Sequence, residues 1–212
     1  MANNKTLDQL GLKYGTDKAS SHHDYCKVYD SFFSPLRDKD FTFLELGYGG
    51  HEDPHKGGES VHMWHEYFPK AKIACVDNEA KLNIPLWLRL FTCSQDDEDF
   101  LGSAVNMVGR PTIVIDDASH LSSLTIKSFE ILFPLLQKGG FYCVEDLHQS
   151  YHSHFYGEIE ANENPAKGKT AMNYFKRLCD EVNKDLIDPK YHLGYDIEFM
   201  HFSKDLLIIK KK

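Results

Sequence analysis

The chain has 212 residues, a formal net charge of −8 and a hydrophobic content of 42%. This length suffices for one domain with a full hydrophobic core, whereas an acidic chain lacks the basic surface that nucleic acid binding requires. The apolar runs are much shorter than the roughly 20 residues of a membrane-spanning helix. We therefore expect neither nucleic acid nor a membrane as a partner.

The termini and the cysteines bear on cellular location. The N-terminal residues are polar, unlike those of a signal peptide. The five cysteines are an odd number and form no C-x-x-C pair, which favours reduced, buried thiols. These features predict a cytoplasmic protein.

Residues 1–40 are predicted to be largely helical. Hydrophobic spacing indicates a short amphipathic helix at Thr6–Tyr14 and an aromatic-lined helix at Tyr25–Leu36. Between them lie the polar turn YGTDK (Tyr14–Lys18) and the segment SSHHDY (Ser20–Tyr25). The aromatic stripe is more typical of a core than of a cofactor site. We expect residues 1–40 to form an N-terminal helical cap on a single globular unit, residues 41–212.

Apolar strands are expected at Phe41–Leu46, Lys72–Val76 and Leu88–Cys93, with a helix at Glu59–Phe68 after the first strand. The sequence GYGG follows the first strand, and Gly47 and Gly49 would let the backbone approach a ligand closely. Asp77 follows the second strand, where an acidic side chain accepts hydrogen bonds from a ribose diol in nucleotide-binding folds. Together they favour a nucleoside-cofactor site over an ordinary turn aspartate.

An acidic segment, SQDDED (Ser94–Asp99), follows the third strand. Hydroxyl and acidic side chains suit a helix N-terminus, because they accept hydrogen bonds from its free N–H groups and interact favourably with its dipole. Ser94 or Asp96 can serve as the N-cap. A helix start is a sufficient explanation of this segment.

The central stretch, Pro111–His148, is predicted to form a strand–helix–strand unit. Apolar strands at Thr112–Ile115 and Phe141–Val144 flank a helical repeat that Gly139-Gly140 ends. Because both strands point the same way, the polar residues after them meet at one sheet edge; they are Asp116, Asp117, His120, Glu145, Asp146 and His148. Four carboxylates and two imidazoles in one place require a cation or a shared proton. A solvated edge with ordinary helix caps is the alternative.

The remaining chain is less regular. Gln149–Lys169 has little apolar periodicity and is long for a passive connection, which favours a substrate loop or lid. A helix is expected at Ala171–Val182, and Asp196–His201 with Leu206–Lys210 should form a hairpin. An α/β chain that ends in an antiparallel hairpin is typical of class I methyltransferases rather than dehydrogenases.

The stretches LELGYGG, IDDASH and GGFYCVEDLH resemble S-adenosylmethionine-dependent methyltransferases. With LGLKYGTDK, SHHDY and GGHEDPHKGGES added, the chain from Leu7 to Tyr151 resembles the sugar O-methyltransferases of macrolide biosynthesis, the macrocin and mycinamicin type, and their cephalosporin-hydroxylase-like relatives. The resemblance implies a doubly wound α/β fold with a mostly parallel seven-stranded sheet and a C-terminal antiparallel hairpin. It also implies S-adenosylmethionine as the cofactor.

The same resemblance implies a set of cofactor-binding residues. The set comprises Gly47 and Gly49 beneath the cofactor, Asp77 on the ribose, Gln95 and Asp96 near the adenine, Tyr14, Thr16 and Lys18 from the turn that helps close the site, and Glu45 and Asp116 at strand ends.

A divalent metal, usually Mg²⁺, is implied as well, held by Asp117 and Asp146, with His120 as general base. The chemistry agrees, because a sugar hydroxyl is too weak an acid to react unaided at neutral pH. A metal that binds two vicinal hydroxyls lowers the pKa of one, and a nearby imidazole can take its proton. Carboxylate oxygens suit such a hard cation. A third carboxylate ligand stays open, with Glu145 as a candidate.

The sequence thus predicts metal-dependent methyl transfer from S-adenosylmethionine to a hydroxyl of a sugar or glycoside. A nucleotide-linked sugar, a surface polysaccharide precursor and a secondary metabolite all remain open as acceptors. An NAD(P)-type oxidoreductase is disfavoured because GYGG lacks the third glycine of the dinucleotide-binding pattern. A non-catalytic S-adenosylmethionine-binding module would need neither metal nor base. The macrolide enzymes carry a large extra N-terminal domain, so their assembly is not transferred, and a homo-oligomer stays open.

Overall fold

The computed structural model describes residues 5–152 and 168–212. Over these residues a seven-stranded sheet forms in the order β3-β2-β1-β4-β5-β7-β6. The strands are β1 (Thr42–Leu46), β2 (Lys72–Asp77), β3 (Arg89–Thr92), β4 (Pro111–Asp116), β5 (Phe141–Val144), β6 (Ile197–Phe202) and β7 (Leu207–Lys211). The first five strands are parallel, whereas β7 is antiparallel to β5 and β6. This confirms the predicted doubly wound, mostly parallel α/β fold with a C-terminal hairpin.

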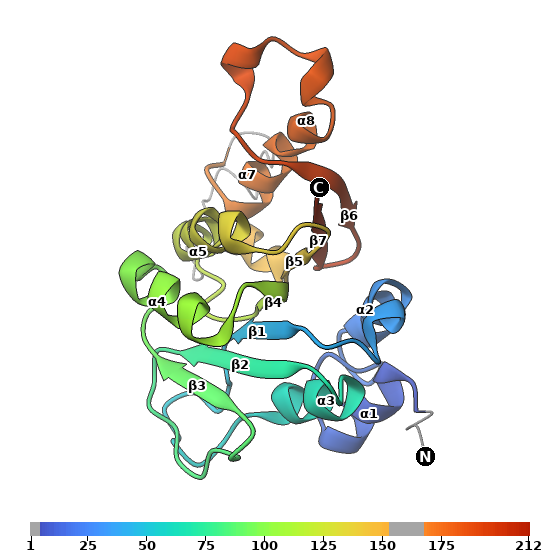
Figure 1. Cartoon of the computed structure of the whole chain (residues 1–212), viewed down its shortest axis with the longest axis vertical. Helices are drawn as coiled ribbons and strands as arrows, with labels where there is room; N and C mark the ends of the chain where they lie inside the picture. The colour runs from blue at the N-terminus through green and yellow to red at the C-terminus, as the bar shows by residue number, and fades with distance from the viewer. Residues whose placement is uncertain (1–4, 153–167) are drawn as a thin grey trace.

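Helices cover both faces of this sheet (Figure 1). One face carries α1 (Leu7–Tyr14), α2 (Tyr25–Phe33) and α3 (Glu59–Tyr67), and the other carries α4 (Glu98–Val108), α5 (Ser122–Leu135) and α7 (Ala171–Arg177). The α-helix α8 (Cys179–Val182) and short 3₁₀ segments at Ser34–Leu36, Leu147–Tyr151, Lys184–Leu186 and Pro189–Tyr191 complete the described elements.

The two faces build two hydrophobic clusters. β1 and β5 are buried along their whole length, and successive side chains of a strand point to opposite faces. In β1, Phe43 therefore joins the cluster under α1–α3, while Leu44 joins the one under α4, α5 and α7. Phe141 and Tyr142 of β5 divide in the same way. Burial on both faces explains why these strands are continuous apolar runs.

The N-terminal helices share the core of the sheet. α1 begins at a capping box, in which the Thr6 hydroxyl accepts from the Gln9 N–H and the Gln9 side chain accepts from the Thr6 N–H. Leu7 and Leu10 of this helix lie in the same cluster as Phe43 of β1. The hydrophobic core includes residues on both sides of residue 40. The division of the chain at this residue remains a prediction.

Most predicted elements are confirmed, with bounds shifted by one or two residues, but three helices differ: one in its start, one in its continuity and one in its end. The N-cap of α4 is Asp97, which accepts from the Phe100 N–H, and not Ser94 or Asp96. The backbone carbonyl of Ser94 instead accepts from the Asp97 N–H in a turn, and the helix begins after this turn. The single helix expected at Ala171–Val182 is broken at Leu178, whose N–H donates three residues back to Phe175 as in a 3₁₀ turn.

The helix α5 ends at Leu135, before Gly139-Gly140, because Leu136 adopts an extended backbone with ψ of 147°. The ammonium of Lys211 on β7 donates to the carbonyls of Phe133, Pro134 and Leu136 at 2.9 to 3.0 Å. A cation at a helix C-terminus satisfies carbonyls that have no partner inside the helix. The two glycines form the turn into β5 and do not stop the helix.

The described part of the chain contains no helix that is long and apolar enough to cross a membrane. Residues 153–167 lie outside the described residues, and most of the expected substrate loop or lid at Gln149–Lys169 falls there.

Candidate cofactor and metal site

A cavity of about 470 Å³ lies at the carboxyl ends of β1, β2, β4 and β5. Nine of the residues expected at the site line it: Thr16, Lys18, Gly47, Gly49, Asp77, Gln95, Asp117, His120 and Asp146. Four others do not line it: Tyr14, Glu45, Asp96 and Asp116. Carboxyl strand ends are where open α/β sheets bind ligands.

The turn after β1 needs its first glycine. Gly47 has φ of 98°, and a Cβ placed on it would overlap the carbonyl oxygen of Asp117. The Gly47 N–H donates to the Val76 carbonyl at 2.8 Å, and the Asp117 N–H donates to the Leu46 carbonyl at 3.0 Å. The ladder of the sheet therefore extends past the strands, and it holds the glycine turn directly against the turn that carries Asp117.

The Asp77 carboxylate is held in place by two backbone N–H groups. Its two oxygens accept from the backbone N–H groups of Tyr48 and Glu79, each at 2.8 Å. Each carboxylate oxygen can accept a further hydrogen bond, and the side chain lines the cavity. Gln95 also lines the cavity, with its Oε1 accepting from the Ser119 N–H at 3.0 Å.

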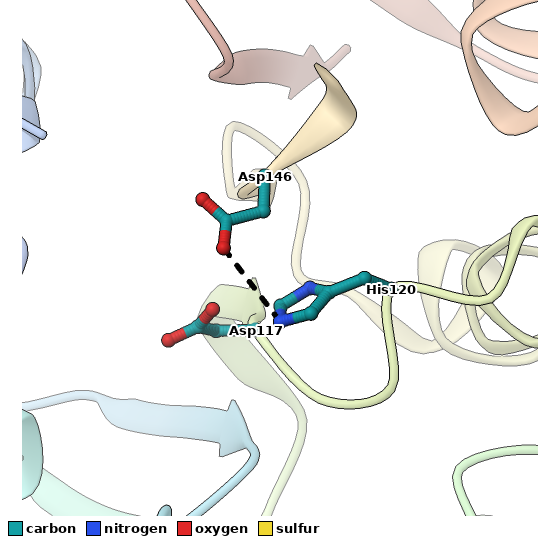
Figure 2. Close-up of side chains that lie close together, drawn as sticks. All are labelled: Asp117, His120 and Asp146. Carbon is teal, nitrogen blue, oxygen red and sulfur yellow. Dashed lines mark ion pairs between the residues drawn. The ribbon is translucent and has the colours of Figure 1, made fainter. Parts of the chain in front are cut away.

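Asp117, His120 and Asp146 form a compact group (Figure 2), and one ligand atom from each lies within 4.8 Å of the others. Among the described residues this is the one group of at least three carboxylate, imidazole or thiol side chains that could hold a metal ion. His120 Nε2 and Asp146 Oδ2 are 3.7 Å apart. Two carboxylates beside an imidazole fit a hard divalent cation that keeps several waters.

Two members of this group have an uncommon backbone conformation. His120 and Asp146 have φ of 57° and 54°, in the left-handed region that residues other than glycine rarely adopt. Such strained positions are held by the surrounding structure and gather at functional sites. Here they turn the chain just after β4 and β5, so that both side chains reach the group around Asp117.

Lys18 lies beneath the group, and its residue is only 1% exposed. Its ammonium donates to Asp117 Oδ2 and, at 2.7 Å, to Glu145 Oε2, and Glu45 Oε1 is 3.7 Å away. Burial by itself lowers the pKa of Lys18, but the charges of the carboxylates outweigh it and raise the pKa well above the ordinary value. The ammonium of Lys18 has three N–H donors and faces three carboxylates, so side chains of the protein itself already serve as its partners.

Glu45 and Asp116 are buried inside the protein. The Ser60 hydroxyl donates to Glu45 at 3.1 Å, and burial raises the pKa of Glu45 to about 7. The hydroxyls of Ser128 and Tyr142 donate to Asp116, whose pKa burial raises to about 6. Neither carboxylate lines the cavity, so neither is placed to contact a ligand there.

The other expected residues also have partners elsewhere. The Tyr14 hydroxyl donates to Glu66, and its ring stacks on His62. Asp96 is exposed and accepts from the Ser94 hydroxyl. Glu145 is outside the metal-binding group, and His148 lies 3.6 Å from Asp205. The six polar side chains after β4 and β5 thus do not all meet: Asp117, His120 and Asp146 form one group, and the Lys18 ammonium joins Glu145 to Asp117.

Tyr25 and Tyr29 lie in the hydrophobic core, as the aromatic stripe predicts, but sequence reasoning missed that their hydroxyls reach the carboxylates after β5. The Tyr25 hydroxyl donates to Asp146 Oδ1 at 2.8 Å, and the Tyr29 hydroxyl donates to Glu145 Oε1 at 2.7 Å. Burial and the neighbouring carboxylates raise the pKa of both tyrosines. The available signal was the residue type, because a buried tyrosine needs a partner for its hydroxyl and a phenylalanine does not.

The sheet order, the glycine turn and the acidic group at the carboxyl edge define the class as a methyltransferase-type α/β fold. A search with family models finds no match to the sequence. The chain is 32% identical over 213 residues to 8-demethyl-8-alpha-L-rhamnosyl tetracenomycin-C 2'-O-methyltransferase of Streptomyces olivaceus, covering 97% of this chain and 54% of that protein. It is 31% identical over 211 residues to mycinamicin VI 2''-O-methyltransferase of Micromonospora griseorubida, covering 97% of this chain and 52% of that protein.

The solved structure of MycE methyltransferase from the mycinamycin biosynthetic pathway, in complex with Mg and SAH, matches with a TM-score of 0.91 and 30% identity, over 99% of this chain and 54% of that chain. The chain is therefore homologous to sugar O-methyltransferases of the mycinamicin and macrocin type, as the sequence predicts. It spans about half the length of these relatives.

Proposed function

We propose that this protein transfers a methyl group from S-adenosylmethionine to a hydroxyl of a sugar or glycoside with the help of a divalent cation, Mg²⁺. The observation that carries the proposal is a single cavity lined both by the glycine turn with Asp77 and by Asp117, His120 and Asp146. Homology to sugar O-methyltransferases supports it, and a MycE complex contains Mg, SAH and mycinamycin VI.

On this proposal, the glycine turn and Asp77 bind the nucleoside part of the cofactor. Gly47 and Gly49 expose backbone along the cavity wall, and the preset Asp77 carboxylate accepts from the ribose hydroxyls. Thr16 and Gln95 lie in the same wall. The polypeptide thereby contributes mainly position, which for an in-line transfer between two bound molecules is a large part of the rate enhancement.

Asp117 and Asp146 would hold the cation, and His120 would take the proton of the acceptor hydroxyl. A cation bound there lowers the pKa of a sugar hydroxyl. The hydroxyl oxygen attacks the methyl carbon as the bond from that carbon to the sulfonium breaks, and the proton moves to His120 Nε2. Asp146 Oδ2, 3.7 Å away, would stabilise the imidazolium that results.

The finer features of the proposal follow from charge and chemistry. With a net charge of −8, a small neutral or cation-bridged acceptor suits this chain better than nucleic acid. All five cysteines are unpaired thiols, which suits a reducing compartment and supports a cytoplasmic location.

Calorimetric titration with S-adenosylhomocysteine, with and without Mg²⁺ and with NADH as control, tests the cofactor assignment. We expect binding of the homocysteine nucleoside and none of NADH. Methyl transfer from labelled S-adenosylmethionine is then screened over nucleotide-linked sugars and glycosides. Binding of NADH, or of neither ligand, contradicts the proposed function. Binding without transfer to any sugar contradicts the acceptor class and leaves the cofactor assignment in place.

A further inference from the structure

Two tyrosines on α2 reach two consecutive carboxylates after β5. Tyr25 and Tyr29 are four residues apart and so lie on one face of the helix. Tyr25 donates to Asp146 at 2.8 Å, and Tyr29 donates to Glu145 at 2.7 Å. The two hydrogen bonds have the same chemistry and come from the same helix. They end on carboxylates with different surroundings: Asp146 belongs to the metal-binding group, whereas Glu145 lies outside that group and accepts from the Lys18 ammonium.

The carboxylate of Asp146 is divided between two partners. Its Oδ1 accepts from Tyr25, while its Oδ2 faces His120 at 3.7 Å (Figure 2). The hydrogen bond therefore sets the rotation of the carboxylate about its last bond and decides which oxygen points into the group. Asp146 also has a left-handed backbone conformation, so the extended conformation of β5 does not continue through this residue.

Tyr25 is itself rigidly placed and is separate from the ligands. Its residue is 2% exposed and does not line the cavity. The ring of His23 stacks on the tyrosine ring with centroids 5.0 Å apart and planes at 17°. A hydroxyl on a buried, stacked ring can fix a carboxylate without touching cofactor or acceptor.

We propose that Tyr25 is a positioning residue that orients the Asp146 carboxylate for cation binding. The proposal rests on the proposed function, because it takes the group of Asp117, His120 and Asp146 as a metal site. It gives the SHHDY segment a role that neither the core stripe nor the cofactor wall explains. Partners of this kind behind a metal ligand typically change metal affinity about 10- to 100-fold.

The test compares Tyr25→Phe with Tyr29→Phe in the full chain. Each variant removes one hydroxyl and keeps the ring, and each leaves one carboxylate without its tyrosine. Mn²⁺ affinity, measured by calorimetry and by the EPR signal of free Mn²⁺, reports on the metal site. Affinity for S-adenosylhomocysteine without metal reports on the cofactor wall, and thermal unfolding reports on stability.

We expect Tyr25→Phe to weaken Mn²⁺ binding by about tenfold or more, with unchanged affinity for the nucleoside. Tyr29→Phe should retain the Mn²⁺ affinity of the wild type and unfold at a lower temperature, because Glu145 is buried. Tyr25→Met, in which a flexible apolar side chain fills the space, should reproduce the metal defect and serves as the second variant for the same measurement.

Equal Mn²⁺ affinity in Tyr25→Phe and the wild type overturns the positioning role while the proposed function stands. Equal losses in both phenylalanine variants overturn it too, because they indicate general loosening of α2. A wild-type protein that binds no Mn²⁺ overturns the metal site itself, and with it both proposals.

Discussion

Each of two neighbouring strands ends in two consecutive carboxylates that have opposite environments. After β4, Asp116 is 2% exposed and Asp117 has a side chain 22% exposed. After β5, Glu145 is 3% exposed and Asp146 has a side chain 16% exposed. In both pairs the first carboxylate is internal, and the second lines the cavity. Two adjacent acidic residues of similar chemistry thus have separate places, one inside the protein and one at the cavity.

The two internal carboxylates also differ from each other. Asp116 points toward α5 and accepts from the hydroxyls of Ser128 and Tyr142, which are neutral donors. Glu145 points toward α2 and accepts from the Lys18 ammonium and from Tyr29. On one side of the sheet, hydroxyl groups stabilise Asp116, and on the other side the buried ammonium of Lys18 stabilises Glu145. The Lys18 ammonium also donates to Asp117, so it connects the internal carboxylate Glu145 with a carboxylate that lines the cavity.

The largest expected effect separates the two members of the β5 pair. Asp146→Asn should reduce Mg²⁺ or Mn²⁺ affinity and methyl transfer by about 100-fold or more and leave stability near that of the wild type. Glu145→Gln should do the reverse, lowering the free energy of unfolding by about 3 kcal/mol, because it breaks a buried ion pair, while retaining metal affinity. Calorimetry and denaturant unfolding measure both.

Removal of metal provides the control for that comparison. Excess chelator should abolish methyl transfer by the wild type, and added Mg²⁺ should restore it. Undiminished activity in chelator contradicts the roles of Asp117 and Asp146, and a stability loss in Asp146→Asn equal to that in Glu145→Gln contradicts the division into structural and site carboxylates.

A second prediction concerns His120 within the cavity-facing group. His120→Ala should reduce turnover by about 100- to 10,000-fold, as expected for loss of a general base, with normal affinity for S-adenosylhomocysteine. Parallel Mn²⁺ titration distinguishes the base from a metal ligand: retained metal affinity supports the base, whereas a matching loss of metal binding assigns His120 to the cation. A fully active variant contradicts both roles.

The smallest expected effect tests the internal carboxylate of the β4 pair. Burial raises the pKa of Asp116 from 3.8 to about 6, so the folded protein binds this proton more tightly than the unfolded chain. This contribution to stability is present below the ordinary pKa and is lost as the pH rises through the folded pKa. A shift of about two units corresponds to roughly 3 kcal/mol at most.

Asp116→Asn removes that titration. The unfolding free energy of the variant, relative to the wild type, should therefore rise by roughly 3 kcal/mol or less as the pH increases from about 3.8 to above 6. Denaturant unfolding across this range measures the difference. A difference that is constant with pH means that the pKa of Asp116 is the same in the folded and the unfolded protein, and contradicts the raised pKa.

The strands and the position of the site could be predicted because their signals are local. The runs FTFLEL, KIACV, TIVI and FYCV are apolar and short, and parallel strands place their following residues at one edge. Asp77, Asp117 and Asp146 were identified from that rule and from family resemblance, and all three line the cavity. Glu45 and Asp116 were assigned to the cofactor by the same reasoning and lie instead in the core.

By itself, the sequence determined the α/β class, the order of the strands along the chain and the sheet edge at which the expected site residues gather, because hydrophobic period and strand direction are properties of neighbouring residues. Only the tertiary structure decided which carboxylate of each pair faces the cavity, that Lys18 lies among Glu45, Asp117 and Glu145, and that Tyr25 reaches Asp146. These contacts join residues about 30 to 130 positions apart and depend on left-handed turns and helix placement, which follow from packing of the whole core rather than from any short stretch.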